Sequence, residues 1–221
     1  MKGKLIVIEG ACDGIGKTTQ YNLLKQYFED KGYNVCSHHF PTYNSKQGFL
    51  AENYLKGEFG LPEELSPYLI NTMYAVDRAL TWKDELKKEY EKGNIILLDR
   101  YTTSSLIYQT SLMSDINEKK EFINYVSDYE YNKLGIKEPD KVIFLTADFD
   151  VVSNMRNKRT DNDGVKNDVY ERDNGLMKKI YDNSSFVADY LKFDIVKCDN
   201  DANLRYIDDI QEEIRKIIGK I

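Results

Sequence analysis

Residues 14–19 near the N-terminus have the types and spacing that phosphate binding requires. They read Gly14, Ile15, Gly16, Lys17, Thr18 and Thr19, directly after Asp13. Glycines let backbone N–H groups approach phosphate oxygens, lysine neutralises phosphate charge, and a threonine hydroxyl can hold Mg²⁺. A strand before this turn and a helix after it would complete the site, because the first N–H groups of a helix lack intrahelical partners. The segment therefore predicts binding of the β- and γ-phosphates of a nucleotide.

The loop departs from the usual G-x-x-x-x-G-K-T spacing by one residue. Five residues rather than four separate Gly10 from Gly16, and Ala11 stands where that pattern has glycine. Counted back from Lys17, however, every residue expected to touch phosphate or Mg²⁺ is present. The surplus therefore falls at residues 11–12, where a bulge between strand and loop can absorb it. We expect a functional phosphate loop with a lengthened entrance.

A second pair of charged residues, Asp99 and Arg100, follows Asn94 and the apolar run 95–98. A carboxylate at the carboxyl end of a buried strand beside the loop strand can reach loop-bound Mg²⁺. The Arg100 guanidinium offers a planar fork for a second phosphate. Taken alone, the pair fits an ordinary ion pair at a sheet edge equally well. The nearby phosphate loop is what favours a functional role.

Two further sets of side chains fit an acceptor that carries a base as well as a phosphate. Tyr74 and Arg78 are one helical turn apart and could stack on, and hydrogen-bond to, a planar ring. Arg156 and Arg159 lie in a polar segment from which they could swing onto transferring phosphates. For each set alone, core packing or a solvated loop is the better explanation, and the other motifs are needed to favour function.

Short apolar runs alternate with longer amphipathic ones, which is typical of an α/β fold with a parallel sheet between two layers of helices. The expected strands of this central five-stranded sheet are 4–9, 34–38, 94–98, 141–146 and 194–197. His38 and His39 are adjacent at a strand end, so we expect them to point to opposite sides and assign them no metal role.

The helical patterns are clearest at 16–30 and from Ser66 to about Glu91. In the longer helix, one apolar face is formed by Leu69, Met73, Val76 and Leu80. Residues 154–173 are flanked by helical patterns and are rich in Asp, Asn, Lys and Arg, so this stretch is expected to be a mobile loop.

Composition restricts the class of protein. With 221 residues and 41% hydrophobic content the chain fits one α/β domain, and its net charge of −6 argues against general affinity for nucleic acid or membranes. Its cysteines, Cys12, Cys36 and Cys198, are odd in number and far apart, which indicates neither a disulfide framework nor a zinc cluster. We find no signal peptide or membrane-spanning run and expect a cytoplasmic protein.

Five short motifs are spread over most of the chain. They are E-G-x-D-G-x-G-K-T-T in the loop, Phe40-Pro41 after the second strand, Tyr74-Ala75-Val76-Asp77-Arg78, Asp99-Arg100-Tyr101, and Asp168-Val169-Tyr170-Glu171-Arg172-Asp173. In this order and spacing they resemble the thymidylate kinases, within the nucleoside-monophosphate kinases. The resemblance implies a P-loop kinase fold and in-line transfer of the ATP γ-phosphoryl group to dTMP with Mg²⁺, giving dTDP.

The resemblance also implies roles for individual residues. Lys17 and Thr18 would bind ATP and Mg²⁺, with Asp99 as a second metal residue. Asp13 would steer the acceptor, and Arg100 would hold its phosphate. Some members place an arginine directly after the loop aspartate, whereas members with glycine at that point, as here, supply the catalytic arginine from the lid. Of the residues in the lid, about 154–173, the resemblance gives this catalytic role to Arg156 and Arg159.

In the acceptor pocket, the resemblance implies that Tyr74 stacks on thymine, Arg78 bonds its O4 edge, and Tyr108 disfavours a 2′-hydroxyl. The other residues expected at the acceptor are Phe40, Pro41, Tyr43, Arg100, Ser104, Ser105, Tyr170 and Glu171. Thr42 stands where many members have a phosphate-binding arginine or another charged residue, which would either weaken acceptor binding or shift it to Tyr43 and Arg100. A homodimer is implied by the resemblance only.

Two alternatives stay open on the sequence. A deoxynucleoside kinase shares the phosphate loop and an acidic residue followed by arginine, although the segment 168–173 and the Tyr74/Arg78 pair favour a monophosphate acceptor. A nucleotide-binding protein without turnover is suggested by the irregular loop. A GTPase switch is disfavoured because residues 132–135 read N-K-L-G and lack the aspartate that would pair with guanine.

Overall fold

The computed structural model describes residues 2–11, 14–153, 168–200 and 203–219. Its centre is a parallel sheet in the order β2-β3-β1-β4-β5. The strands are β1 (Lys4–Gly10), β2 (Val35–His39), β3 (Ile95–Asp99), β4 (Lys141–Thr146) and β5 (Asp194–Lys197). Each lies within one residue of its predicted bounds, so the predicted α/β fold with a five-stranded parallel sheet is confirmed.

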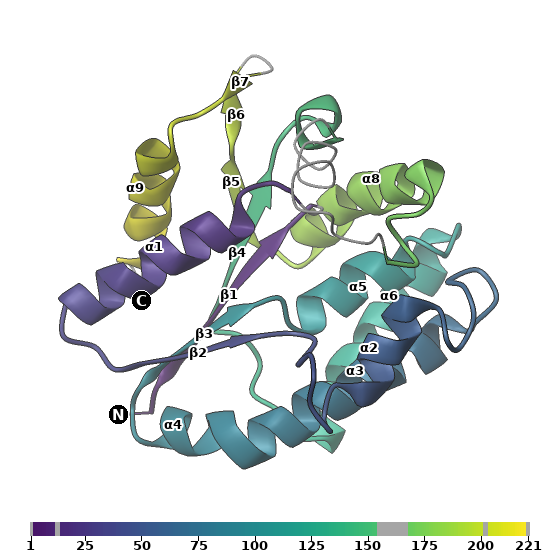
Figure 1. Cartoon of the computed structure of the whole chain (residues 1–221), viewed down its shortest axis with the longest axis horizontal. Helices are drawn as coiled ribbons and strands as arrows, with labels where there is room; N and C mark the ends of the chain where they lie inside the picture. Colours follow the sequence, from purple (N-terminus) through teal and green to yellow (C-terminus); the bar gives the residue numbers. More distant parts are fainter. Residues whose placement is uncertain (1, 12–13, 154–167, 201–202, 220–221) are drawn as a thin grey trace.

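Helices cover both faces of this sheet and complete three layers (Figure 1). On one face α1 (Lys17–Asp30) packs against α9 (Ile207–Ile218). The other face carries α3 (Pro67–Thr81), α5 (Thr102–Thr110), α6 (Ile116–Ser127) and α8 (Asn174–Tyr190), and α2 (Phe49–Lys56) packs on α3. A short hairpin of β6 (Asp199–Asn200) and β7 (Asn203–Leu204) precedes α9. Because both faces of the sheet are covered, β1 and β3 can be continuous apolar runs.

The helix predicted from Ser66 to Glu91 is continuous but not uniform. A π-helical turn, η1 (Trp82–Leu86), joins α3 to α4 (Lys87–Glu91). A second π-helical segment, η2 (Asp128–Lys133), extends α6. Such wider turns are uncommon in helices and are frequent at functional sites.

The face of α3 that carries Leu69, Met73, Val76 and Leu80 is only partly buried in the fold. Met73 is buried, whereas Leu69 and Leu80 are 51% and 38% exposed. The neighbouring face is buried instead, through Ile70 and Arg78. The physical reason is tertiary, because buried partners satisfy the Arg78 guanidinium and let a charged residue occupy a core-facing position.

The carboxyl ends of the neighbouring strands β2, β3 and β1 meet at one edge of the sheet. Asp99 pairs in register with Ile8 of β1 and with His39 of β2. The backbone continues this pattern beyond the strands, since Phe40 N donates to Asp99 O at 3.0 Å and Arg100 N donates to Ile8 O at 3.1 Å. Loops that follow parallel strands therefore converge at this edge, where α/β proteins bind their ligands. Over the described ranges, no helix is both long and apolar enough to cross a membrane.

Candidate active site

The phosphate loop has the strand-turn-helix geometry that the sequence predicts. Gly14 and Gly16 have φ angles of 91° and 84°, and Gly16 caps α1. A Cβ on Gly16 would meet nothing within 4 Å, so glycine is required there by the left-handed backbone rather than by space. Of the two residues at which the surplus was placed, Ala11 continues the strand pairing, since its N–H donates to Leu145 O at 3.0 Å, and Cys12 lies outside the described residues.

A cavity of about 600 Å³ opens beside this loop at the carboxyl edge of the sheet. Its lining is Gly14, Gly16, Lys17, Thr18, Thr19, His39, Phe40, Pro41, Tyr43, Leu55, Tyr74, Arg78, Asp99, Arg100, Tyr101, Ser104, Ser105, Tyr108, Gln109, Asp168 and Tyr170. Predicted site residues from five separate segments of the chain thus line one cavity, whose volume is typical of small-molecule binding sites.

A few of the predicted residues lie elsewhere. Ile15 is buried in the hydrophobic core and does not line the cavity. Glu171 is also absent from the lining, and its carboxylate accepts a hydrogen bond from Asp168 N at 3.4 Å. Asp13, Arg156 and Arg159 lie outside the described residues.

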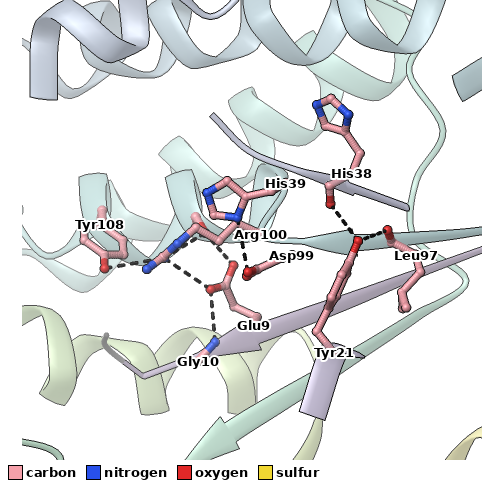
Figure 2. Close-up of polar contacts among 10 residues, drawn as sticks. Glu9, Gly10, Tyr21, His38, His39, Leu97, Asp99, Arg100 and Tyr108 are labelled. Carbon is pink, nitrogen blue, oxygen red and sulfur yellow. Dashed lines mark hydrogen bonds and ion pairs between the residues drawn. The ribbon is translucent and has the colours of Figure 1, made fainter. Parts of the chain in front are cut away.

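Arg100 is held in the cavity by a buried carboxylate from β1. Glu9 is fully buried, and its Oε1 lies 3.6 Å from Arg100 Nη1 (Figure 2). The same carboxylate accepts hydrogen bonds from the Thr103 and Ser104 hydroxyls at 2.8 and 2.6 Å. Arg100 Nη1 also donates to Tyr108 Oη at 3.5 Å. This network fixes the guanidinium beside the phosphate loop strand.

Asp99 presents a carboxylate oxygen that its neighbours leave unsatisfied. Its Oδ2 lies 3.1 Å from His39 Nδ1, whereas Oδ1 is buried without a hydrogen-bond partner among the described residues (Figure 2). Burial by itself raises the pKa of Asp99, but the His39 hydrogen bond and the positive charges of Lys17 and Arg100 outweigh it and lower the pKa overall. The group is thus held as an anion.

The two histidines of β2 diverge, as expected. His39 turns to Asp99, and the His38 ring lies apart from it in Figure 2, with Nε2 2.9 Å from the Thr42 hydroxyl. Thr42 N in turn donates to Asp77 Oδ2 at 2.7 Å. The uncharged residue at position 42 therefore ties the segment after β2 to α3.

Four tyrosines pack together at the cavity. Three of them, Tyr74, Tyr108 and Tyr170, form a wall of its lining, whereas Tyr54 is fully buried and does not line it. Tyr170 contacts Tyr54 and Tyr108 edge to face, with ring centroids 6.0 and 5.0 Å apart, and Tyr54 makes the same contact with Tyr74 at 6.1 Å. The Tyr170 hydroxyl accepts from Tyr54 Oη at 3.0 Å and from Gln109 Nε2 at 2.9 Å. Burial raises the pKa of Tyr74 well above its ordinary value, so the ring stays neutral. This wall offers flat apolar faces to a ligand.

Arg78 is a buried charge with a buried partner. It is 2% exposed, and Glu130 is fully buried. Arg78 Nε donates to Glu130 Oε2 at 2.6 Å and Nη2 donates to Oε1 at 2.7 Å, a two-point pairing. Burial lowers the pKa of Arg78, but the Glu130 charge and hydrogen bonds raise it more, so the guanidinium is charged.

With this geometry in place, comparison with known proteins is decisive for the family. The sequence profile of thymidylate kinases matches residues 8–214. The chain belongs to the thymidylate kinase family. The thymidylate kinase of Caldicellulosiruptor saccharolyticus is 28% identical over 221 residues, covering 100% of this chain and 98% of that protein. The thymidylate kinase of a Thermoanaerobacter species is 33% identical over 161 residues, 72% of this chain and 73% of that protein.

The fold agrees with a solved thymidylate kinase. The structure of the Candida albicans enzyme superposes with a TM-score of 0.74 at 23% identity, covering 99% of this chain and 92% of that one. This superposition confirms the predicted P-loop kinase fold. The profile match and the relatives confirm the predicted kinase family, and the deoxynucleoside kinase alternative is not favoured. Membership of the thymidylate kinase family implies ATP as the phosphoryl donor.

Three polar groups were not predicted for this thymidylate kinase family member: Gln109, which lines the cavity, and Glu9 and Glu130, which are fully buried and contact the cavity residues Arg100 and Arg78. The sequence does contain a local indication of a role for Glu9, because it is a carboxylate at the end of an apolar strand. Gln109 lines the cavity with its Oε1 buried and unpartnered among the described residues, and its position one residue after Tyr108 is a weak signal. The sequence contains no such indication for Glu130, since nothing near it predicts a contact with Arg78.

Proposed function

We propose that the protein phosphorylates dTMP with ATP and Mg²⁺, giving dTDP. The observation that carries the proposal is a single cavity lined both by a phosphate loop with Lys17 and by the base-sized wall with Tyr74 and Arg78. Phosphoryl transfer needs little covalent chemistry from the protein, so catalysis is mostly positioning and charge neutralisation. A cavity that holds donor phosphates and an acceptor nucleotide together supplies both.

The phosphate groups of donor and acceptor are assigned to the basic side chains. Backbone amides of 14–19 and the Lys17 ammonium bind the donor phosphates. Arg100, held by Glu9, binds the acceptor phosphate in a two-point fashion. Arg156 and Arg159, in a lid of residues 154–173, stabilise the charge that builds up during transfer, and Asp13 steers the acceptor.

Mg²⁺ is assigned to the Thr18 hydroxyl and to Asp99. The fit is supported by the buried, unpartnered Asp99 Oδ1, because a hard cation prefers carboxylate oxygens, directly or through water. When bound with ATP, Mg²⁺ would neutralise phosphate charge. The lowered pKa of Asp99 keeps the oxygen anionic for that role.

The base is assigned to the end of the cavity with Tyr74 and Arg78. A guanidinium only donates hydrogen bonds, so it favours the O4 carbonyl of thymine over the amino group of cytosine. Gln109 Oε1, which accepts no hydrogen bond from the described residues, can take the thymine N3–H. Tyr108 stands beside Arg100, where it would crowd the 2′-hydroxyl of a ribonucleotide.

The direct test is ADP release measured with dTMP, dUMP, UMP, CMP, dCMP, AMP and GMP as acceptors, and with thymidine. We expect kcat/KM for dTMP to exceed that for dCMP by at least about 100-fold, since a site that pairs with a carbonyl rejects an amine. Lys17→Ala is the catalytic control and should abolish turnover. Equal rates over the panel would remove the base assignment, and ATP binding without ADP release would establish the binding-only alternative.

The proposal extends to assembly and location. It includes a homodimer, which exposed apolar residues such as Leu69 and Leu80 on α3 support. It also places the enzyme in the cytoplasm, the compartment of its nucleotide substrates. Cys36 and Cys198 are free thiols, which agrees with a reducing compartment.

A further inference from the structure

Glu130 is a buried carboxylate that the proposed mechanism does not use, although it touches a cavity residue. Both of its oxygens are engaged by Arg78, and Oε2 also accepts from the Thr102 hydroxyl at 3.0 Å. It is fully buried, and it is not part of the cavity lining. Any effect of Glu130 on a ligand must therefore pass through Arg78.

The placement of Glu130 depends on an unusual helical turn. It lies within η2, the π-helical continuation of α6, while Arg78 lies on α3, 52 positions earlier in the chain. Its own backbone carbonyl accepts from Ile136 N at 3.1 Å, which anchors the turn. Wider helical turns of this kind recur at functional sites.

The pairing decides which part of the Arg78 guanidinium faces a ligand. Nε and Nη2 are taken by Glu130, and Nη2 also lies 3.2 Å from Asn71 Oδ1 and 3.0 Å from Ser105 Oγ. Nη1 has a weaker contact, 3.5 Å from the Tyr101 carbonyl. The two-point contact removes rotation about the end of the side chain and leaves Nη1 as the nitrogen with donor capacity to spare.

The pairing also sets the charge at this end of the cavity. Arg78 and Glu130 form a tight two-point pair, with contacts of 2.6 and 2.7 Å and no net charge. Arg100 is in looser contact with its carboxylate, 3.6 Å from Glu9 Oε1, and Lys17 adds a further positive charge to the cavity lining. A neutral donor suits an uncharged carbonyl, and the basic residues suit phosphate. Without Glu130, Arg78 would be a third cation able to attract an acceptor phosphate to the wrong end.

We propose that Glu130 is a positioning residue that fixes and neutralises Arg78 for reading the acceptor base. The proposal rests on the proposed function, in which Arg78 contacts the pyrimidine O4. A role in stability alone is a poor explanation, because buried ion pairs are often no more stabilising than apolar side chains of the same size.

The test is Glu130→Gln, with kcat and KM measured for dTMP, dCMP and ATP. We expect KM for dTMP to rise about tenfold with a smaller change in kcat, because a binding contact is weakened. The preference for dTMP over dCMP should fall by a similar factor, and KM for ATP should stay within about twofold. Glu130→Asp, which keeps the charge but not the reach, should give an intermediate preference.

Two controls separate positioning from folding. Asp199→Asn removes another buried carboxylate, one that accepts a hydrogen bond from Asp148 N and is not in the cavity lining. It should lower Tm and leave the dTMP to dCMP preference unchanged. In an Arg78→Met background, Glu130→Gln should have no further effect on that preference, because the effect of Glu130 passes through Arg78.

Each outcome decides one of the two proposals. A wild-type enzyme without dTMP preference contradicts the proposed function itself. A wild-type enzyme with that preference, and a folded Glu130→Gln or Glu130→Asp variant that keeps it in full, overturns the positioning role alone. A loss of preference that persists to the same extent in the Arg78→Met background also overturns it.

Discussion

At the scale of single residues, the charges of the cavity are held in place by neighbouring polar side chains. Glu9, which is fully buried, contacts Arg100, and Asp99 contacts His39, whose side chain is 46% exposed, both at the carboxyl edge of the sheet. The buried contact is the stronger constraint, because hydrogen bonds and ion pairs are stronger in a low-dielectric setting. Lys17, Thr18 and Arg100 could be predicted from the sequence because their motifs are local.

A residue-scale prediction concerns Asp99→Asn. We expect the Mg²⁺ concentration needed for half-maximal activity to rise about tenfold, because an amide is a weaker cation ligand than a carboxylate. Titration of Mg²⁺ at fixed ATP measures this, with Asp194→Asn, which alters an ion pair with Lys141 away from the cavity, as the control. An unchanged Mg²⁺ requirement would count against Asp99 as a metal residue.

The same variant has a pH signature. Folding lowers the pKa of Asp99, so its carboxylate stabilises the folded state above the unfolded pKa of about 3.9. This stabilisation is lost as pH falls through the lower, folded pKa. The free energy of unfolding of Asp99→Asn should therefore fall less than that of the wild-type protein as the pH is lowered through this range.

At the scale of helices and strands, the residue at which a helix begins follows from the local sequence more directly than the choice of its buried face does. α1 begins at a glycine with positive φ, and α8 begins after Asp173, whose carboxylate accepts from Gly175 N at 2.7 Å and Leu176 N at 3.2 Å. Signals of this kind are readable in sequence. The buried face of α3 was harder to predict, because Arg78 faces the interior only where Glu130 meets it.

An element-scale prediction concerns this cap. Asp173→Ala should lower the free energy of unfolding by about 1 kcal/mol, because two helix N–H groups lose their acceptor. Asp115→Ala, at the matching cap of α6, should cost about as much. Only the first variant should also raise KM for dTMP, since Asp173 follows the cavity residue Tyr170 closely. Denaturant titration and kinetics measure both effects, and equal KM values in the two variants would contradict the link.

At the scale of the whole molecule, three layers bring five separate motifs to one edge of a sheet. The side of α3 that does not face the cavity is left with exposed apolar groups. They are Tyr68, Leu69 and Leu80, next to Tyr125 of α6, whose ring lies 4.9 Å from that of Tyr68. Exposed apolar side chains that gather on one helix are a feature of protein interfaces.

We expect the protein to be a dimer through this surface. Its mass in solution should be about twice the 25.8 kDa of the chain, and Leu69→Glu with Leu80→Glu should return it to one chain. Tyr206→Glu, at a residue that is 82% exposed before α9, is the control and should leave the mass unchanged. Light scattering after size exclusion measures this, and a wild-type mass of one chain at micromolar concentration would contradict it.

The sequence by itself determined the alternation of strands and helices, the phosphate loop and the order of the motifs, because periodicity, glycine placement and motif spacing are properties of neighbouring residues. Only the tertiary structure decided which groups hold the reactive side chains in place. Glu9 reaches Arg100, and Glu130 reaches Arg78, across long stretches of chain. Such pairs exist because burial makes an unpartnered charge costly, and the partner is whichever charge the fold brings near.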